Sequence, residues 1–145
     1  YDFDSFDECD SRDHYCDTVF YSEPYSLRLD STMQFSPGFH SMYCALTQFD
    51  HAWIRVSGYL YPTKPVDSNP VYLVTTFEHK GKCYKYATSI NLNPQVEVNK
   101  WNHISYDYIT PEVRDKHDKL IVYFWDPSSQ TVFIDEMKVL VYTKD

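Results

Sequence analysis

Two predicted strands, 52–61 and 120–125, place aromatic side chains on one face and aliphatic side chains on the other. The alternation is regular in both segments, and alternate residues of a strand share a face. An indole or phenol ring can cover the apolar face of a sugar ring and keep polar contacts at its rim. The residues that could form such a platform, if the two strands are near neighbours in one sheet, are Trp53, Tyr59, Tyr61, Tyr123 and Trp125.

Arg55 lies among these aromatic residues and would hydrogen-bond sugar hydroxyls or pair with a uronic acid. The same face could instead pack against the N-terminal segment, a neighbouring domain or a second copy of the chain. An aromatic surface indicates binding without identifying the ligand. A glycan, a protein contact and internal packing therefore all remain open.

Motifs of catalysis are missing from the sequence. There is no G-x-S-x-G, H-E-x-x-H, phosphate loop or dinucleotide fingerprint, and only 3 glycines are present to build one. Three carboxylates, Glu78, Asp107 and Glu136, cannot be assigned to one cleft, as a glycosidase would require. A polysaccharide lyase using Arg55, His103 and Tyr106 is a minor alternative, and we predict a protein that is not an enzyme.

The composition predicts one soluble domain over residues 1–145. No apolar run approaches the ~20 residues of a membrane span, and the acidic first residues argue against a signal peptide, although the domain could be cut from a longer precursor. The formal charge is −8, of which −6 falls in residues 1–17. Without a basic surface, nucleic acid and anionic membranes are not expected as partners.

The four cysteines do not define a disulfide framework. They have no C-x-x-C spacing, so a zinc ribbon or a thioredoxin motif is not predicted. Residues 9 and 16 could close a small loop in an exported protein, and buried thiols are the alternative. The cysteines whose oxidation state the sequence leaves open are Cys9, Cys16, Cys44 and Cys83.

Short strands separated by turns make up most of the chain, and no helical periodicity is evident. About eight strands at this spacing predict an antiparallel β-sandwich over 26–145, preceded by an acidic lead-in over 1–25. The predicted strands are 25–29, 32–35, 42–49, 52–61, 71–79, 83–89, 101–109 and the two strands of a final hairpin over 119–142.

The final hairpin also carries a resemblance to a known family. Its segments LIVYFWD (120–126) and VFIDEMKV (132–139) resemble the last hairpin of the galactose-binding-like jelly-roll domains, which include many carbohydrate-binding modules. The resemblance extends over most of 25–145, through the SLRL segment (26–29) and the strand that follows Trp101. It implies a jelly roll in which the first and last strands are adjacent.

The resemblance further implies a structural calcium at Asp135, which sits inside an apolar strand and needs a partner there. Calcium binds six to eight oxygen atoms. Adjacency of the first and last strands would let the lead-in complete the site through Asp2, Asp4 or Asp7. The alternative is that Asp135 accepts hydrogen bonds from turn backbone or pairs with Lys138.

The sequence therefore predicts a non-catalytic carbohydrate-binding domain, an accessory module of a larger exported protein. It would be extracellular, periplasmic or at the cell surface, without inserting in a membrane. Its ligand-binding residues would be Trp53, Arg55, Tyr59, Tyr61, Tyr123 and Trp125, with calcium as a structural cofactor. The alternative is a protein-interaction or structural domain of a cell-surface protein that uses the same aromatic face.

Overall fold

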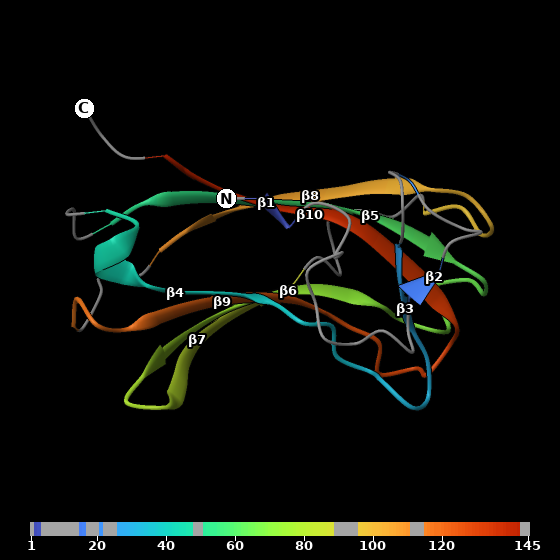
Figure 1. Ribbon diagram of the computed structural model, residues 1–145, viewed down its shortest axis with the longest axis horizontal. Helices are drawn as coiled ribbons and strands as arrows, with labels where there is room; N and C mark the ends of the chain where they lie inside the picture. The colour runs from blue at the N-terminus through green and yellow to red at the C-terminus, as the bar shows by residue number, and fades with distance from the viewer. Residues whose placement is uncertain are drawn as a thin grey trace.

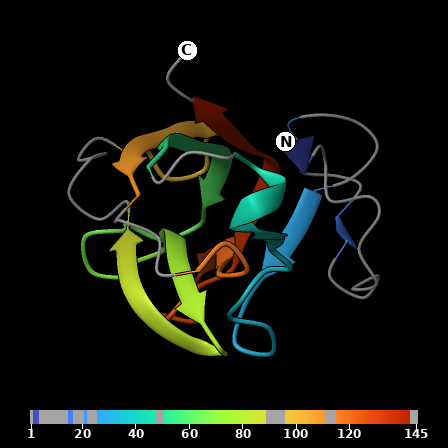
Figure 2. The same ribbon diagram turned by 90° about the vertical axis from the view of Figure 1, so that its left-hand side faces the viewer.

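Two antiparallel sheets pack face to face and enclose the core (Figures 1 and 2). The computed structural model describes residues 2–3, 15–16, 21, 26–47, 51–88, 96–110 and 115–142. The all-β sandwich predicted from the sequence is confirmed. In chain order the elements are β1 (Asp2–Phe3), β2 (Tyr15–Cys16), β3 (Ser26–Leu29), β4 (Phe39–Met42), the 3-10 helix η2 (Tyr43–Ala45), β5 (Trp53–Pro62), β6 (Tyr72–His79), β7 (Lys82–Thr88), β8 (Asn102–Ile109), β9 (Lys119–Trp125) and β10 (Val132–Tyr142).

The larger sheet has six strands in the order β2-β3-β10-β5-β8, with β1 also pairing with β10. The smaller sheet has four strands in the order β4-β9-β6-β7. From β3 onward the chain changes sheet at every connection except the β6–β7 hairpin. That hairpin turns through Lys80 and Gly81, both at positive φ, which is the backbone of a two-residue turn that matches strand twist.

The predicted final hairpin is wrong, although both of its strands exist. β9 lies in the four-stranded sheet between β4 and β6, and β10 lies in the six-stranded sheet between β3 and β5. Each strand therefore has both edges occupied by other strands. The segment between them crosses from sheet to sheet, and it is fixed on the way because the Asp126 amide donates to the Gln34 carbonyl at 2.7 Å.

Two other predicted strands differ from the structure. Instead of a strand at 32–35, the chain turns, and the turn is closed by reciprocal backbone hydrogen bonds between Asp30 and Met33. The strand predicted at 42–49 lies earlier, as β4, and the chain then enters η2. The Tyr43 amide donates to the Asp118 carbonyl at 2.7 Å. This hydrogen bond holds the helical turn beside the start of β9, the strand that pairs with β4.

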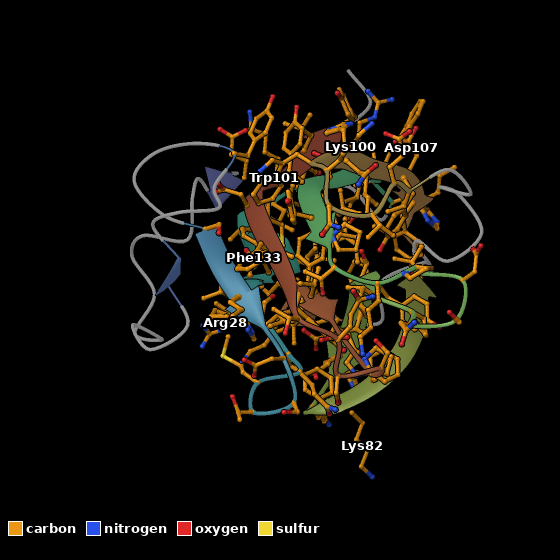
Figure 3. All side chains as sticks on the ribbon, turned by 90° about the vertical axis from the view of Figure 1, so that its right-hand side faces the viewer. Arg28, Lys82, Lys100, Trp101, Asp107 and Phe133 are labelled. Atoms are coloured by element: carbon orange, nitrogen blue, oxygen red, sulfur yellow. The ribbon has the colours of Figure 1, made fainter. Side chains whose placement is uncertain are left out.

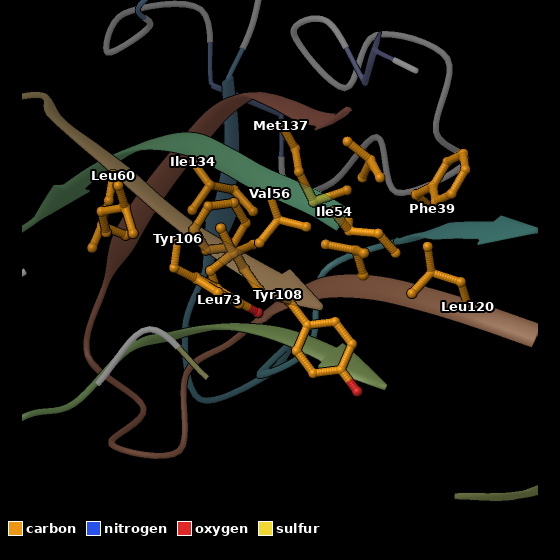
Figure 4. Packing of buried hydrophobic residues seen from close by; sticks show 14 of the residues in the cluster. Phe39, Ile54, Val56, Leu60, Leu73, Tyr106, Tyr108, Leu120, Ile134 and Met137 are labelled. Atoms are coloured by element: carbon orange, nitrogen blue, oxygen red, sulfur yellow. The ribbon is translucent and has the colours of Figure 1, made fainter. Parts of the chain in front are cut away.

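Aliphatic and aromatic side chains from both sheets fill the space between them (Figure 4). The alternation predicted for β5 is confirmed, because Ile54, Val56 and Leu60 are buried. Polar groups also meet across this core, where the hydroxyls of Thr75 and Tyr106 lie 2.6 Å apart. Hydrogen bonding between buried hydroxyls avoids the cost of an unpaired polar group.

The acidic lead-in reaches the last strand, as the family resemblance implied. β1 pairs with β10 through Asp2 opposite Lys138 and Phe3 opposite Met137. Of the other lead-in acids, Asp4 and Asp7 lie outside the described residues. The described part of the chain contains no helix long and apolar enough to cross a membrane.

The cysteines can be located in part. Cys44 and Cys83 are exposed and form no disulfide. Cys16 belongs to β2, and Cys9 lies outside the described residues. A loop closed by Cys9 and Cys16 therefore stays an open possibility.

Replacing Gly58 with alanine should destabilise the fold, because the Phe124 ring of the opposite sheet packs directly against this glycine of β5. A Cβ atom there would lie 2.7 Å from Phe124 Cζ, well inside van der Waals contact. Overpacking of a close-packed core costs about 1–3 kcal/mol. Urea denaturation of Gly58→Ala should show a loss of this size.

The control is Gly81→Asn in the β6–β7 turn. An added Cβ meets nothing within 4 Å there, and asparagine tolerates positive φ better than most residues. A Gly58→Ala protein as stable as Gly81→Asn would contradict the packing described for Phe124.

Candidate functional site

Among the residues that the structure describes, exposed and half-buried aromatic side chains form three separate groups on the two outer faces. We call them the lead-in cluster, the Trp53 patch and the Trp125 cluster. The lead-in cluster contains Tyr21, Tyr59, Tyr61, Trp101 and Phe133; the Trp53 patch contains Trp53, Arg55, Asp107, Ile109, Leu140 and Tyr142; the Trp125 cluster contains Phe35, Tyr72, Tyr123 and Trp125.

The single aromatic platform predicted from the sequence does not form. It required the strands of Trp53 and Trp125 to be neighbours, whereas β5 and β9 belong to different sheets. Side chains that point away from the core on these two strands face opposite sides of the sandwich. The residues Trp53, Arg55, Tyr59 and Tyr61 are therefore separated by the whole core from Tyr123 and Trp125.

The lead-in cluster is closed by packing between its own rings. Tyr21 stacks on Tyr59 with ring centroids 3.6 Å apart and an interplanar angle of 13°. Tyr61 makes edge contacts with Trp101 at 5.5 Å and with Phe133 at 5.8 Å. The Tyr21 side chain, together with burial, raises the pKa of Tyr59 to about 12. For Tyr59, packing against the N-terminal segment is thus the alternative that the structure supports.

Asp135 lies beneath this cluster and is fully buried. Its Oδ2 accepts the Tyr21 amide at 3.0 Å and its Oδ1 accepts the Glu136 amide at 2.9 Å. The register of β10 against β5 shifts between Asp135 and Lys138, and Glu136 has φ +46°. This bulge explains how a carboxylate in the middle of a strand meets backbone N–H donors.

The Trp53 patch lies at the other end of the same outer face. Arg55 donates to both carboxylate oxygens of Asp107, from Nε at 2.8 Å and from Nη2 at 3.2 Å. The hydrogen bond to Asp107 raises the pKa of Arg55, and the reciprocal bond lowers the pKa of Asp107. Figure 3 shows Asp107 at the surface, apart from Trp101 and Phe133 of the lead-in cluster.

The Trp125 cluster occupies one end of the outer face of the four-stranded sheet. Phe35 is bridged to Trp125 through the backbone, and Tyr72 is opposite Trp125 in the β6–β9 register. The Phe35 and Trp125 rings are parallel to within 6° at 5.9 Å, and the Tyr72 ring lies 5.5 Å from Trp125. Tyr123 completes the group, 6.0 Å from Phe35.

Phe35 and Tyr72 were missed by the sequence prediction. Phe35 follows a turn and belongs to no strand of useful length, so no alternation assigns it to a face. Tyr72 lies between Val71 and Leu73 in the predicted strand 71–79, and this alternation could have identified it as an outward-facing aromatic residue. Phe35 is 53% exposed, the most exposed ring of this cluster.

The outer face continues from the Trp125 cluster along β9 and β6. Its middle carries Val74, Thr76 and Ile121, which point outward yet are buried, so larger neighbouring side chains must cover them. Its far end is polar and carries Lys119 opposite Glu78. One face therefore offers stacked rings at one end and charged groups at the other.

The candidate catalytic residues are not brought together. Tyr106 is in the core, whereas Arg55 belongs to the Trp53 patch. Of the carboxylates, Glu78 is on the four-stranded sheet, and Asp107 and Glu136 are on the six-stranded sheet. Among the described residues no three His, Cys, Asp or Glu side chains are grouped as metal ligands.

Asp126 directly follows Trp125 and is fully buried. Its Oδ1 accepts the Ser128 hydroxyl at 2.9 Å, while its Oδ2 is buried without a hydrogen-bond partner. Burial raises the pKa of Asp126 to about 6, and the Ser128 hydrogen bond offsets part of that shift. The carboxyl group below the Trp125 cluster is thus poised to change charge near neutral pH.

Comparison with solved structures adds to this geometry. The chain is similar to the CBM22-2 xylan-binding domain of Paenibacillus barcinonensis Xyn10C, with a TM-score of 0.60, 14% identity, and coverage of 89% of this chain and 85% of that one. It is similar to the C-terminal family 22 carbohydrate-binding module of Clostridium thermocellum Xyn10B, with a TM-score of 0.55, 14% identity, and coverage of 90% of this chain and 80% of that one. A family 16 carbohydrate-binding module also matches, with a TM-score of 0.51, 9% identity, and coverage of 87% of this chain and 83% of that one.

The fold is that of carbohydrate-binding modules. At these identities the likeness establishes architecture, since fold alone does not determine function. No protein-family model and no curated protein sequence matches the chain. The jelly-roll resemblance found in the last two strands is confirmed at the level of the fold.

Replacing Asp126 with asparagine should change how stability depends on pH. Because the folded pKa of about 6 exceeds the ordinary 3.8, the folded state holds the proton more tightly, and stability falls as pH rises through this window. Above pH 6 the free energy of unfolding of the wild type is lower by up to about 3 kcal/mol. Urea denaturation at several pH values should show that the free energy of unfolding of Asp126→Asn increases relative to that of the wild type as pH rises.

The control is Asp107→Asn, which removes an exposed ion pair that solvent screens, so its stability should stay close to that of the wild type from pH 4 to pH 7. If the free energies of unfolding of Asp126→Asn and the wild type differ by the same amount from pH 4 to pH 7, then Asp126 does not titrate in this range.

Proposed function

We propose that the protein is a non-catalytic carbohydrate-binding domain whose binding surface is the Trp125 cluster and the adjoining outer face of the four-stranded sheet. The observation that carries the proposal is the parallel arrangement of Phe35 and Trp125, flanked by Tyr72 and Tyr123. Four contiguous rings on an outer sheet face give a large apolar surface with polar edges.

The chemistry of this face suits a polysaccharide better than a single sugar. From Trp125 to Lys119 the face runs six residues along β9, or roughly 20 Å, which exceeds one sugar ring. Rings at one end would stack on C–H faces. Lys119 and Glu78 at the other end, and His40 opposite Ile121 in the middle of the face, would exchange hydrogen bonds with hydroxyls.

The likeness to xylan-binding and other carbohydrate-binding modules supports the same function and suggests xylan as the first ligand to test. Two of these neighbours are named as parts of larger proteins, Xyn10C and Xyn10B. We therefore infer an accessory role within a longer polypeptide acting outside the cell, where polysaccharides of this kind are met.

Replacing Trp125 with alanine should abolish or strongly weaken glycan binding. Trp125 contacts both Phe35 and Tyr72, so its loss removes the centre of the stacked surface, and a central aromatic anchor contributes about 2 kcal/mol or more, roughly 30-fold in affinity. Calorimetric titration with a panel of xylan, arabinoxylan and cello-oligosaccharides measures this.

Trp53→Ala is the matched control, since it removes the same side chain from the opposite outer face. It should bind glycan like the wild type. If Trp53→Ala loses binding and Trp125→Ala keeps it, the binding face is on the other sheet. If the wild type binds none of the glycans, the alternative of a protein-interaction domain gains support.

We further propose a structural calcium ion at Asp135. Its carboxylate is fully buried and accepts hydrogen bonds from the Tyr21 and Glu136 amides, and carboxylate oxygens are the ligands that calcium prefers. The pairing of β1 with β10 brings the chain that carries Asp2 alongside. Asp135 would hold the ion, with Asp2, Asp4 or Asp7 and backbone carbonyls as the other oxygen ligands.

Calcium should raise the thermal unfolding midpoint if this site exists, because a ligand of the native state alone stabilises it. The expected rise is about 5 °C or more between chelator and millimolar calcium, measured by calorimetry. The rise should disappear in Asp135→Asn and persist in Asp126→Asn, which neutralises a different buried carboxyl. An equal rise in all three proteins would place the ion elsewhere.

A further inference from the structure

The Trp53 patch is an exposed, largely apolar surface that includes one ion pair, Arg55–Asp107. Cross-strand register places Ile109, Trp53 and Tyr142 side by side on β8, β5 and β10. The next row toward the lead-in cluster is Asp107, Arg55 and Leu140. Six side chains from three adjacent strands therefore form two rows on one outer face.

Four of these side chains are apolar and yet exposed to solvent. Ile109 is 70% exposed, Trp53 48%, Tyr142 45% and Leu140 39%. The solvated face of an antiparallel sheet usually carries polar residues, and contiguous apolar patches of more than a few hundred Å² mark interaction sites. The patch thus has the character of an interface.

The arginine makes this surface unsuitable as a second sugar platform. The Arg55 guanidinium carbon lies 5.9 Å from the Trp53 ring centroid and 5.6 Å from that of Tyr142. The cation thus occupies space over both rings. Both oxygens of Asp107 are already engaged by Arg55, and Ile109 and Leu140 are aliphatic.

We propose that the Trp53 patch is the interface of a two-fold homodimer. The patch is self-complementary, since it carries one positive and one negative group with no net charge and apolar groups on either side. In a two-fold interface the same patch meets itself, so Arg55 of each copy can face Asp107 of the other. Three quarters of the formal charge, −6 of −8, lies in residues 1–17, so the rest of the chain, with a net charge of −2, adds little repulsion between two copies.

A partner of strongly charged character does not fit this surface, because a neutral patch offers it no electrostatic steering. A second copy supplies the matching apolar rings and the matching opposite charges at once. The dimer would leave the Trp125 cluster on the outer side of each copy and present two glycan faces pointing away from one another. The inference does not depend on the proposed glycan binding.

Charge reversal tests the self-complementary arrangement. Arg55→Asp gives each copy two negative groups and Asp107→Arg gives each copy two positive groups, so neither variant should dimerise. Mixed in equal amounts, the two variants should form a heterodimer, because each positive group again faces a negative one. Sedimentation velocity of the wild type, each variant and the mixture over a range of concentrations measures this.

Ile109→Lys should also be monomeric, because it places a charge in the most exposed apolar position, and Trp125→Ala should dimerise like the wild type. Thermal unfolding verifies that each variant is folded, and Leu140→Lys replaces any variant that is not. A wild type that stays monomeric at all concentrations overturns the proposal. So does a dimer that survives both charge reversal and Ile109→Lys, since its interface must then be another surface.

Discussion

The packing of the two sheets against each other determines which side chains of this protein can meet a ligand. Every long strand buries one set of alternate residues between the sheets, so the other set must face outward. Gly58 against Phe124 marks how closely the layers approach. Because the core separates the outer faces completely, aromatic residues on β5 and β9 cannot cooperate, whatever their similarity in sequence.

β10 ties the N-terminal part of the chain to the sandwich. It pairs with β3, β5 and β1, and its bulge lets the Asp135 carboxylate accept backbone amides from Tyr21 and Glu136. Tyr21 then stacks on Tyr59, which shields the buried carboxylate from above. Ring packing on this part of the face thus covers a buried carboxyl group, and Tyr59 and Tyr61 are half-buried within that packing.

The two outer faces differ in chemistry and therefore in the partner they suit. Phe35 and Trp125 stack in parallel on one face. On the other face Arg55 lies above Trp53 and Tyr142 and is paired with Asp107. From the sequence, glycan binding and protein contact were alternative interpretations of one aromatic surface. In the structure they are proposals for two separate surfaces on opposite sides of the molecule.

Local patterns in the sequence determined the fold class, the inward side of β5 and the strands β6 to β10, because alternation and turn chemistry are properties of neighbouring residues. The adjacency of the first and last strands came from the family resemblance and not from these patterns. They could not determine sheet membership. The Asp126-Pro127-Ser128-Ser129 turn signals a reversal, but whether β10 returns beside β9 or crosses to β5 depends on nine register pairs with a strand some eighty residues away. Only the tertiary structure decides such distant pairings, and with them which rings share a surface.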